Sequence, residues 1–182
     1  MRKLAIPAAL AALVAGPALA TELSIEVAGE GANGTIVIDM ADDVAPGHVA
    51  QIAALAKEGA YDGVVFHRVI DGFMAQTGDV QFGKLGGDMR RAGMGGSERP
   101  DLKAEFSDLP FERGVVGMAR GGDIDSANSQ FFIMFAPAPH LNEIGYTVVG
   151  HVTEGMDVVD AIKRGEGQSG AVIGQPDVMK KV

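Results

Sequence analysis

The chain has 182 residues and a net charge of −9 at neutral pH, with 26 glycines and no cysteine or tryptophan. Such an acidic chain argues against nucleic acid as a partner, because phosphate binding needs positive charge. The lack of cysteine excludes disulfides, so packing must stabilise what the length indicates is a single domain.

Residues 1–20 have the three parts of a secretory signal peptide. An Arg-Lys pair is followed by an apolar run over residues 4–15 and by an A-x-A cleavage site ending at Ala20. The alternative, a membrane anchor, fits less well because the run is short and two prolines interrupt it. We expect cleavage after Ala20 and a periplasmic domain over residues 21–182 that has no membrane anchor. That domain holds 13 basic and 24 acidic residues, a net charge of −11.

The first part of the mature domain changes from β to helical periodicity. Apolar residues alternate over 22–27 and 34–40, and the Asn33-Gly34 turn between the two runs is typical of a β-hairpin. Over residues 45–61 the apolar positions recur at helical spacing, with a proline suited to the first turn and a glycine suited to the end.

The remainder of the domain returns to short apolar runs. Strands are predicted at 64–70, 115–119, 130–135 and 146–152, with a glycine-rich loop over 83–96 and a second helix over 156–164. Short strands, two helices and many glycine turns favour a mostly β fold. We expect a closed or nearly closed antiparallel barrel with helices at its ends.

Several familiar motifs fail on inspection. Residues 78–84 match G-x-x-x-x-G-K, but Leu85 follows where a P-loop needs Ser or Thr. The polar segment 123–128 lacks the ligand positions of an EF-hand. The four histidines share no ligand spacing, and G-x-S-x-G is absent from the sequence. We therefore expect no bound metal and no covalent catalysis, although nucleotide binding at 78–84 is kept as a minor alternative.

Two separated motifs carry the functional signal. "FHRVIDGFMAQTGD" (66–79) and "SQFFI" (129–133) resemble the paired signatures of the cyclophilin family of peptidyl-prolyl isomerases. The order of helix, "GVVGMAR", "SQFFI" and "VVGHV" is similar as well, and the resemblance extends from Glu22 to about Arg164. It implies a closed eight-stranded antiparallel barrel capped by two α-helices, and an isomerase of X-Pro bonds that needs no cofactor.

The resemblance also implies roles for individual residues. Arg68 is the expected catalytic arginine. The expected substrate-binding residues are Phe73, Met74, Gln76, Ala119, Arg120, Gln130, Phe132, Leu141 and Tyr146, with the backbone at 119–120 pairing with an extended peptide. The expected partners are proline-containing polypeptides, and the protein is expected to be a monomer.

Two other interpretations stay open at this point. Taken singly, the aromatic residues fit a barrel core, and Arg68 fits a surface salt bridge. The chain could also be a proline-peptide-binding chaperone or interaction module without turnover, which would need the apolar pocket but no cation.

The sequence departs from better-known eukaryotic cyclophilins at three site positions. His140 stands where they have a tryptophan that helps to bind cyclosporin, so we expect weak binding of that drug. Tyr146 matches their active-site histidine, and Arg120 matches an asparagine.

Overall fold

The computed structural model describes residues 20–182. Nearly all of the expected signal peptide therefore lies outside the described residues. The described part contains three α-helices, α1 (Pro46–Lys57), α2 (His140–Ile144) and α3 (Met156–Ala161), and a 3-10 turn at Met89–Arg91. Its nine strands are β1 (Glu22–Ala28), β2 (Gly34–Met40), β3 (Val64–Val65), β4 (Arg68–Ile70), β5 (Met74–Thr77), β6 (Val115–Met118), β7 (Phe131–Met134), β8 (Val148–Glu154) and β9 (Val178–Lys181).

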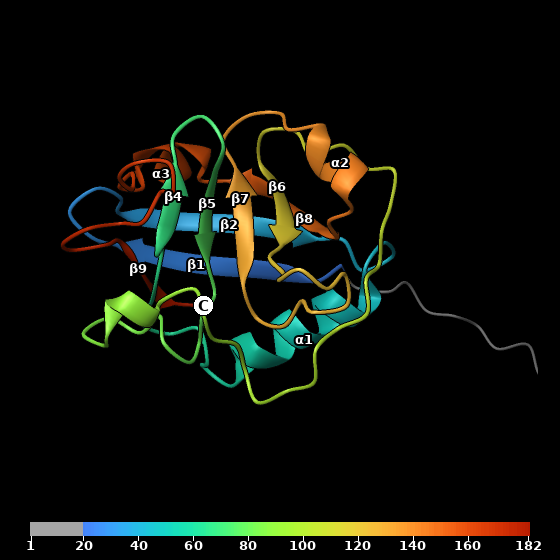
Figure 1. Cartoon of the computed structure of the whole chain (residues 1–182), viewed down its shortest axis with the longest axis horizontal. Coiled ribbons are helices and arrows are strands. Elements are labelled where there is room, and N and C mark those ends of the chain that lie inside the picture. The colour runs from blue at the N-terminus through green and yellow to red at the C-terminus, as the bar shows by residue number, and fades with distance from the viewer. Residues whose placement is uncertain (1–19) are drawn as a thin grey trace, which may run out of the picture.

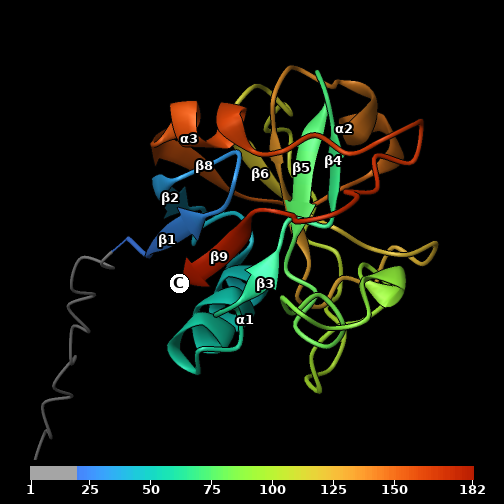
Figure 2. The same cartoon turned by 90° about the vertical axis from the view of Figure 1, so that its left-hand side faces the viewer.

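The strands form one antiparallel sheet in the order β3-β9-β1-β2-β8-β6-β7-β5-β4. The sheet is curled, with β4 to β7 crossing over β1 and β2 (Figure 1). Helix α1 covers one end, and α2 and α3 lie at the opposite end (Figures 1 and 2). The mostly β, antiparallel prediction is confirmed.

The prediction of a closed eight-stranded barrel with two helices is wrong in detail, because the sheet is open, has nine strands and is accompanied by three helices. The predicted strand 64–70 divides at Phe66–His67 into β3 and β4, which lie at opposite edges of the sheet. At the break the backbone bonds to the C-terminal segment instead, through Phe66 N to Asp177 O (2.9 Å) and Val172 N to His67 O (3.0 Å). The two edges are therefore joined by only two residues of chain.

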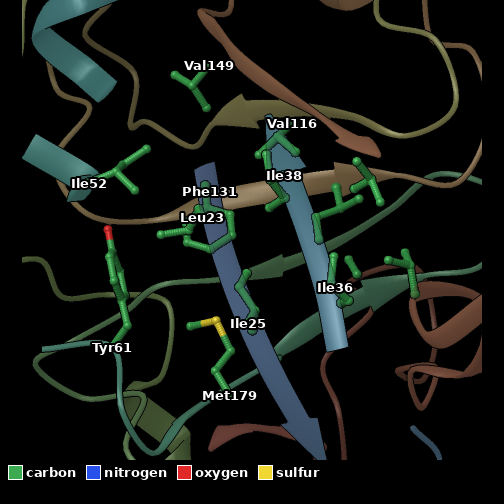
Figure 3. Packing of buried hydrophobic residues seen from close by; sticks show 14 of the residues in the cluster. Leu23, Ile25, Ile36, Ile38, Ile52, Tyr61, Val116, Phe131, Val149 and Met179 are labelled. Atoms are coloured by element: carbon green, nitrogen blue, oxygen red, sulfur yellow. The ribbon is translucent and has the colours of Figure 1, made fainter. Parts of the chain in front are cut away.

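The main core lies inside the curl, between β1 and β2 on one side and β6 and β7 on the other (Figure 3). The alternation of β1 and β2 puts one face of each strand inside, where Ile25, Ile36 and Ile38 are fully buried. Burying each such side chain is worth roughly 1.5–3 kcal/mol. Tyr61 is also fully buried, and its hydroxyl donates to Ser129 O at 2.8 Å.

A second apolar cluster lies apart from this core. It comprises Met74, Phe111, Val115, Phe132, Met134, Ala138, Leu141 and Val148. These residues come from β5 to β8, from α2 and from the loops that precede β6 and α2, and Phe73, Ala119 and Tyr146 pack against them. The predicted apolar site residues either belong to this cluster or pack against it, so the cluster fixes their positions.

The C-terminal segment, to which the sequence assigned no role, completes the sheet. Strand β9 pairs with both β1 and β3, and Met179 is fully buried. Just before it, the buried carboxylate of Asp177 accepts the backbone N–H groups of Gly31, Ala32 and Lys163 at 2.7–3.1 Å. Within residues 20–182, no helix is long and apolar enough to span a bilayer.

Candidate functional site

The structure brings the predicted site residues together. A pocket of about 280 Å³ is lined by nine of them, Arg68, Phe73, Met74, Gln76, Ala119, Arg120, Phe132, Leu141 and Tyr146, together with His140 and Ile144. The tenth, Gln130, lines an adjoining pocket of about 290 Å³ that shares Gln76, Ala119 and Arg120 with the first. Residues more than 70 positions apart in sequence thus form one continuous groove.

The first pocket has a rigid apolar floor. Met74 on β5, Phe132 on β7 and Leu141 on α2 are each at most 5% exposed. The Phe132 ring stacks on Phe111 and meets Tyr146 edge-on, both with centroids 5.9 Å apart. Aromatic rings held in this way form a fixed socket for a small apolar ring.

Arg68 supplies a cation at the edge of this socket. It lies opposite Gln76 in the β4–β5 pairing, and its Nη1 donates to Gln76 Oε1 at 3.1 Å. Its Nε donates to the carbonyl of Ser169 at 3.0 Å. No ion pair found within residues 20–182 includes Arg68, so neutral acceptors fix the guanidinium and its remaining N–H groups can serve a ligand.

A relay of hydrogen bonds holds Gln76 in turn. Its Nε2 donates to Gln130 Oε1 at 2.9 Å, and Gln130 Nε2 donates to the carbonyls of Gly93 and Gly95 at 3.0 and 2.7 Å. The N–H groups of the same two glycines donate to Asp79 Oδ2 at 2.8 and 3.0 Å. The fully buried Asp79 therefore positions Arg68 through the loop and two glutamines.

Sequence reasoning missed two of these supports. Asp79 closes the first motif, but only the structure shows that its carboxylate accepts four backbone N–H groups, including those of Gln81 and Phe82. The Ser169 carbonyl lies far from either motif, and a backbone acceptor has no sequence signature. The motif's own His67 is buried, and burial lowers the pKa of its imidazole even though the charge of Asp79 opposes this.

Arg120 contributes its side chain as well as its backbone. Its guanidinium carbon lies 4.6 Å from the centroid of the Tyr146 ring, and its Nη2 donates to Gly145 O at 2.8 Å and Ile144 O at 3.3 Å. Arg120 thus ties the wall of the pocket to the end of α2. The Ala119 N–H already donates to Gln130 O, so this group is not available for the predicted pairing of residues 119–120 with a peptide.

Together these features define a class of protein: a curled antiparallel β-sheet with a surface groove in which an apolar socket lies beside a fixed cation. Within the part of the chain that the structure describes, no three metal-ligating side chains gather at one place.

Comparison with known proteins supplies the family. The family model for cyclophilin type peptidyl-prolyl cis-trans isomerases matches residues 23–182, so the chain belongs to this family and is a peptidyl-prolyl cis-trans isomerase. A probable peptidyl-prolyl cis-trans isomerase of Brucella suis is 58% identical over 151 residues, which cover 81% of this chain and 76% of that protein. Peptidyl-prolyl cis-trans isomerase B of Bacillus subtilis is 38% identical over 149 residues, covering 81% of this chain and 88% of that protein.

Solved structures have the same fold. A cyclophilin type peptidyl-prolyl cis-trans isomerase of Cryptosporidium parvum matches with a TM-score of 0.73 at 23% identity, over 90% of this chain and 96% of that one. A second structure of that protein was obtained in the presence of the dipeptide Ala-Pro. A cyclophilin of Hirschia baltica matches with a TM-score of 0.68 at 25% identity, over 87% of this chain and 71% of that one.

Proposed function

We propose that this isomerase rotates X-Pro bonds in the groove beside Arg68, and that its substrates are unfolded or flexible exported proteins. Rotation must break amide resonance, a barrier of roughly 18–20 kcal/mol that is crossed unaided in tens of seconds or longer. No covalent bond forms, so neither a nucleophile nor a cofactor is needed. Catalysis requires only that the site binds the twisted amide better than the planar one.

The Arg68 guanidinium is the observation that carries this proposal. Twisting the amide localises a lone pair on the proline nitrogen, which can then accept a hydrogen bond that the planar amide cannot. Arg68 is fixed by Gln76 and Ser169 at the edge of an apolar pocket, where a charge-assisted donor acts more strongly than in water.

The rest of the groove would hold the substrate on both sides of the rotating bond. The proline ring would occupy the apolar pocket lined by Phe73, Met74, Phe132 and Leu141. Gln76 and the backbone near Arg120 would hold the preceding residue, with Gln130 supporting Gln76. Proline-containing peptide as the ligand agrees with the Ala-Pro used with the Cryptosporidium cyclophilin.

The cellular part of the proposal rests on the N-terminal sequence. Residues 1–20 have the pattern of a signal peptide, so the mature chain would begin at Thr21 and act in the periplasm, where we expect it to be a monomer. N-terminal sequencing of the protein recovered from a periplasmic extract tests this, with Thr21 as the expected first residue. A retained Met1 would contradict export.

The catalytic assignment is tested by substituting Arg68 and separating turnover from binding. Relaxation of an Ala-X-Pro-Phe peptide gives kcat/KM, and calorimetry gives affinity. Arg68→Ala should lose about 1.5–3 kcal/mol of charge-assisted hydrogen bonding in the transition state, or about ten- to two-hundredfold in rate, while binding changes less. Arg90→Ala, which removes an exposed arginine, is the matched control. A wild type that binds the peptide but does not speed relaxation would indicate a binding module instead.

A further inference from the structure

Exposed apolar side chains gather beside the pocket of about 280 Å³ that is proposed above to hold the proline ring, called the proline pocket from here on. Phe106 is 49% exposed and Ile144 is 58% exposed, although large apolar side chains are mostly buried in this protein. We call these two residues the apolar shelf. Leu109, 43% exposed, lies just beyond Phe106 in the same loop.

The apolar shelf is continuous with the substrate groove. A hollow of about 430 Å³ is lined by Phe106, Ile144, Tyr146 and the polar residues between them. Ile144 and Tyr146 also line the proline pocket. The Phe106 ring packs on Gly145, where an added Cβ would lie 3.0 Å from ring atom Cζ.

The loop that carries the shelf is fastened to its surroundings. Asn142 Nδ2 donates to Leu109 O at 2.7 Å, and Asn142 Oδ1 accepts from Phe111 N at 3.2 Å. The N–H of Glu105 donates to Thr147 Oγ1 at 3.1 Å. Because these hydrogen bonds already order the loop, binding a ligand would cost less conformational entropy than binding to a mobile loop.

The hollow is also acidic. Asp108 and Glu143 line it, and neither takes part in an ion pair found within residues 20–182. The mature chain already has a net charge of −11. An acidic ligand would therefore be repelled, while an apolar segment that is neutral or basic would not.

We propose that the apolar shelf binds an apolar side chain of the same polypeptide whose proline occupies the pocket. This inference rests on the proposed function and adds a substrate class to it, namely non-acidic segments with an apolar residue close to proline. Folded proteins bury most such residues, so the shelf would favour unfolded chains.

A competition assay tests this with the mature protein. Twelve-residue peptides with one central Ala-Pro and an otherwise Ser/Gly sequence carry a single Leu that is moved along the peptide. Each peptide competes against isomerisation of a chromogenic tetrapeptide. At the favoured position Leu should lower Ki about five- to tenfold relative to Ser, and Glu there should raise it.

Phe106→Ser should abolish the Leu preference while leaving tetrapeptide turnover within about twofold. Leu85→Ser is the matched control, since Leu85 is 51% exposed and lines neither the groove nor the hollow. Phe106→Leu should restore the preference. A Leu preference below twofold at every position, or one that survives Phe106→Ser, would overturn the proposal.

Two other results would overturn it for different reasons. If Phe106→Ser weakens tetrapeptide turnover and long-peptide binding to the same extent, then Phe106 supports the pocket wall and does not bind a substrate side chain. Concentration-dependent dimerisation that Phe106→Ser removes would make the shelf an interface between copies of the chain. A wild type inactive on the tetrapeptide would refute the proposed function itself.

Discussion

Gly117 lies under the floor of the proline pocket, where any side chain should disturb both folding and catalysis. It is in β6, opposite Phe132 in the β6–β7 pairing. An added Cβ would lie 2.5 Å from Phe132 Cζ and 2.6 Å from Phe111 Cε1, far inside van der Waals contact. Both rings are at most 5% exposed, so they can yield only by leaving their stacked arrangement.

Overpacking of this kind typically costs about 1–3 kcal/mol. For a domain of this size, at about 2–4 °C per kcal/mol, that corresponds to a Tm lowered by about 2–12 °C in Gly117→Ala. Because Phe132 also lines the proline pocket, its displacement should raise KM and lower kcat/KM about tenfold or more.

Differential scanning calorimetry and prolyl-peptide relaxation measure the two effects in the same preparation. Gly122→Ala is the matched control, because a Cβ there meets nothing within 4 Å. Adding Phe111→Leu to Gly117→Ala should recover part of both losses, a non-additivity expected of residues in contact. An unchanged Tm together with unchanged kcat/KM would refute this account of how the pocket floor is packed.

Three further predictions concern other parts of the chain. Burial acts to raise the pKa of Glu105, but hydrogen bonds from His48 and the α1 N-terminus outweigh it and lower that pKa. The ionised Glu105 therefore stabilises the folded state above its usual pKa of 4.5, and this stabilisation is lost as the pH falls through the lowered pKa of the folded state. Glu105→Gln should thus reduce the fall of Tm below about pH 4.5. Arg120→Ala should raise KM severalfold, because Tyr146 loses the guanidinium that packs on its ring. Arg120→Lys should restore only part of the original KM, because an ammonium lacks the planar guanidinium that stacks on the ring while it donates to Gly145 O. Steady-state kinetics of the two variants measures both effects. Cyclosporin should bind weakly to the wild type in calorimetry and more tightly to His140→Trp.

Local sequence patterns predicted the elements whose partners are adjacent in the chain. The strands at 22–27 and 34–40 and the first helix match β1, β2 and α1 closely, because their periodicity and turns are local properties. Strand β9 was missed because its order comes from pairing with β1, more than 150 residues earlier. Helix α2 was missed because five residues are too few to show a helical period.

The site was predictable as a set of side chains, but not as an arrangement. The resemblance named residues from Arg68 to Tyr146, and the structure places them in one groove. The groups that hold these side chains in place could not be predicted. The positions of the carbonyls of Ser169, Gly93 and Gly95 depend on how distant loops fold, and a backbone carbonyl is present in every residue type.

The most direct test of the central claim is the rate of cis-trans exchange on the enzyme itself. Exchange NMR at a saturating concentration of an Ala-Pro peptide measures this rate separately from affinity. We predict exchange many times faster than in free peptide for the wild type. In Arg68→Ala the rate should fall about ten- to two-hundredfold while Kd stays within about threefold. Equally fast exchange in Arg68→Ala would contradict the claim that this guanidinium stabilises the twisted amide.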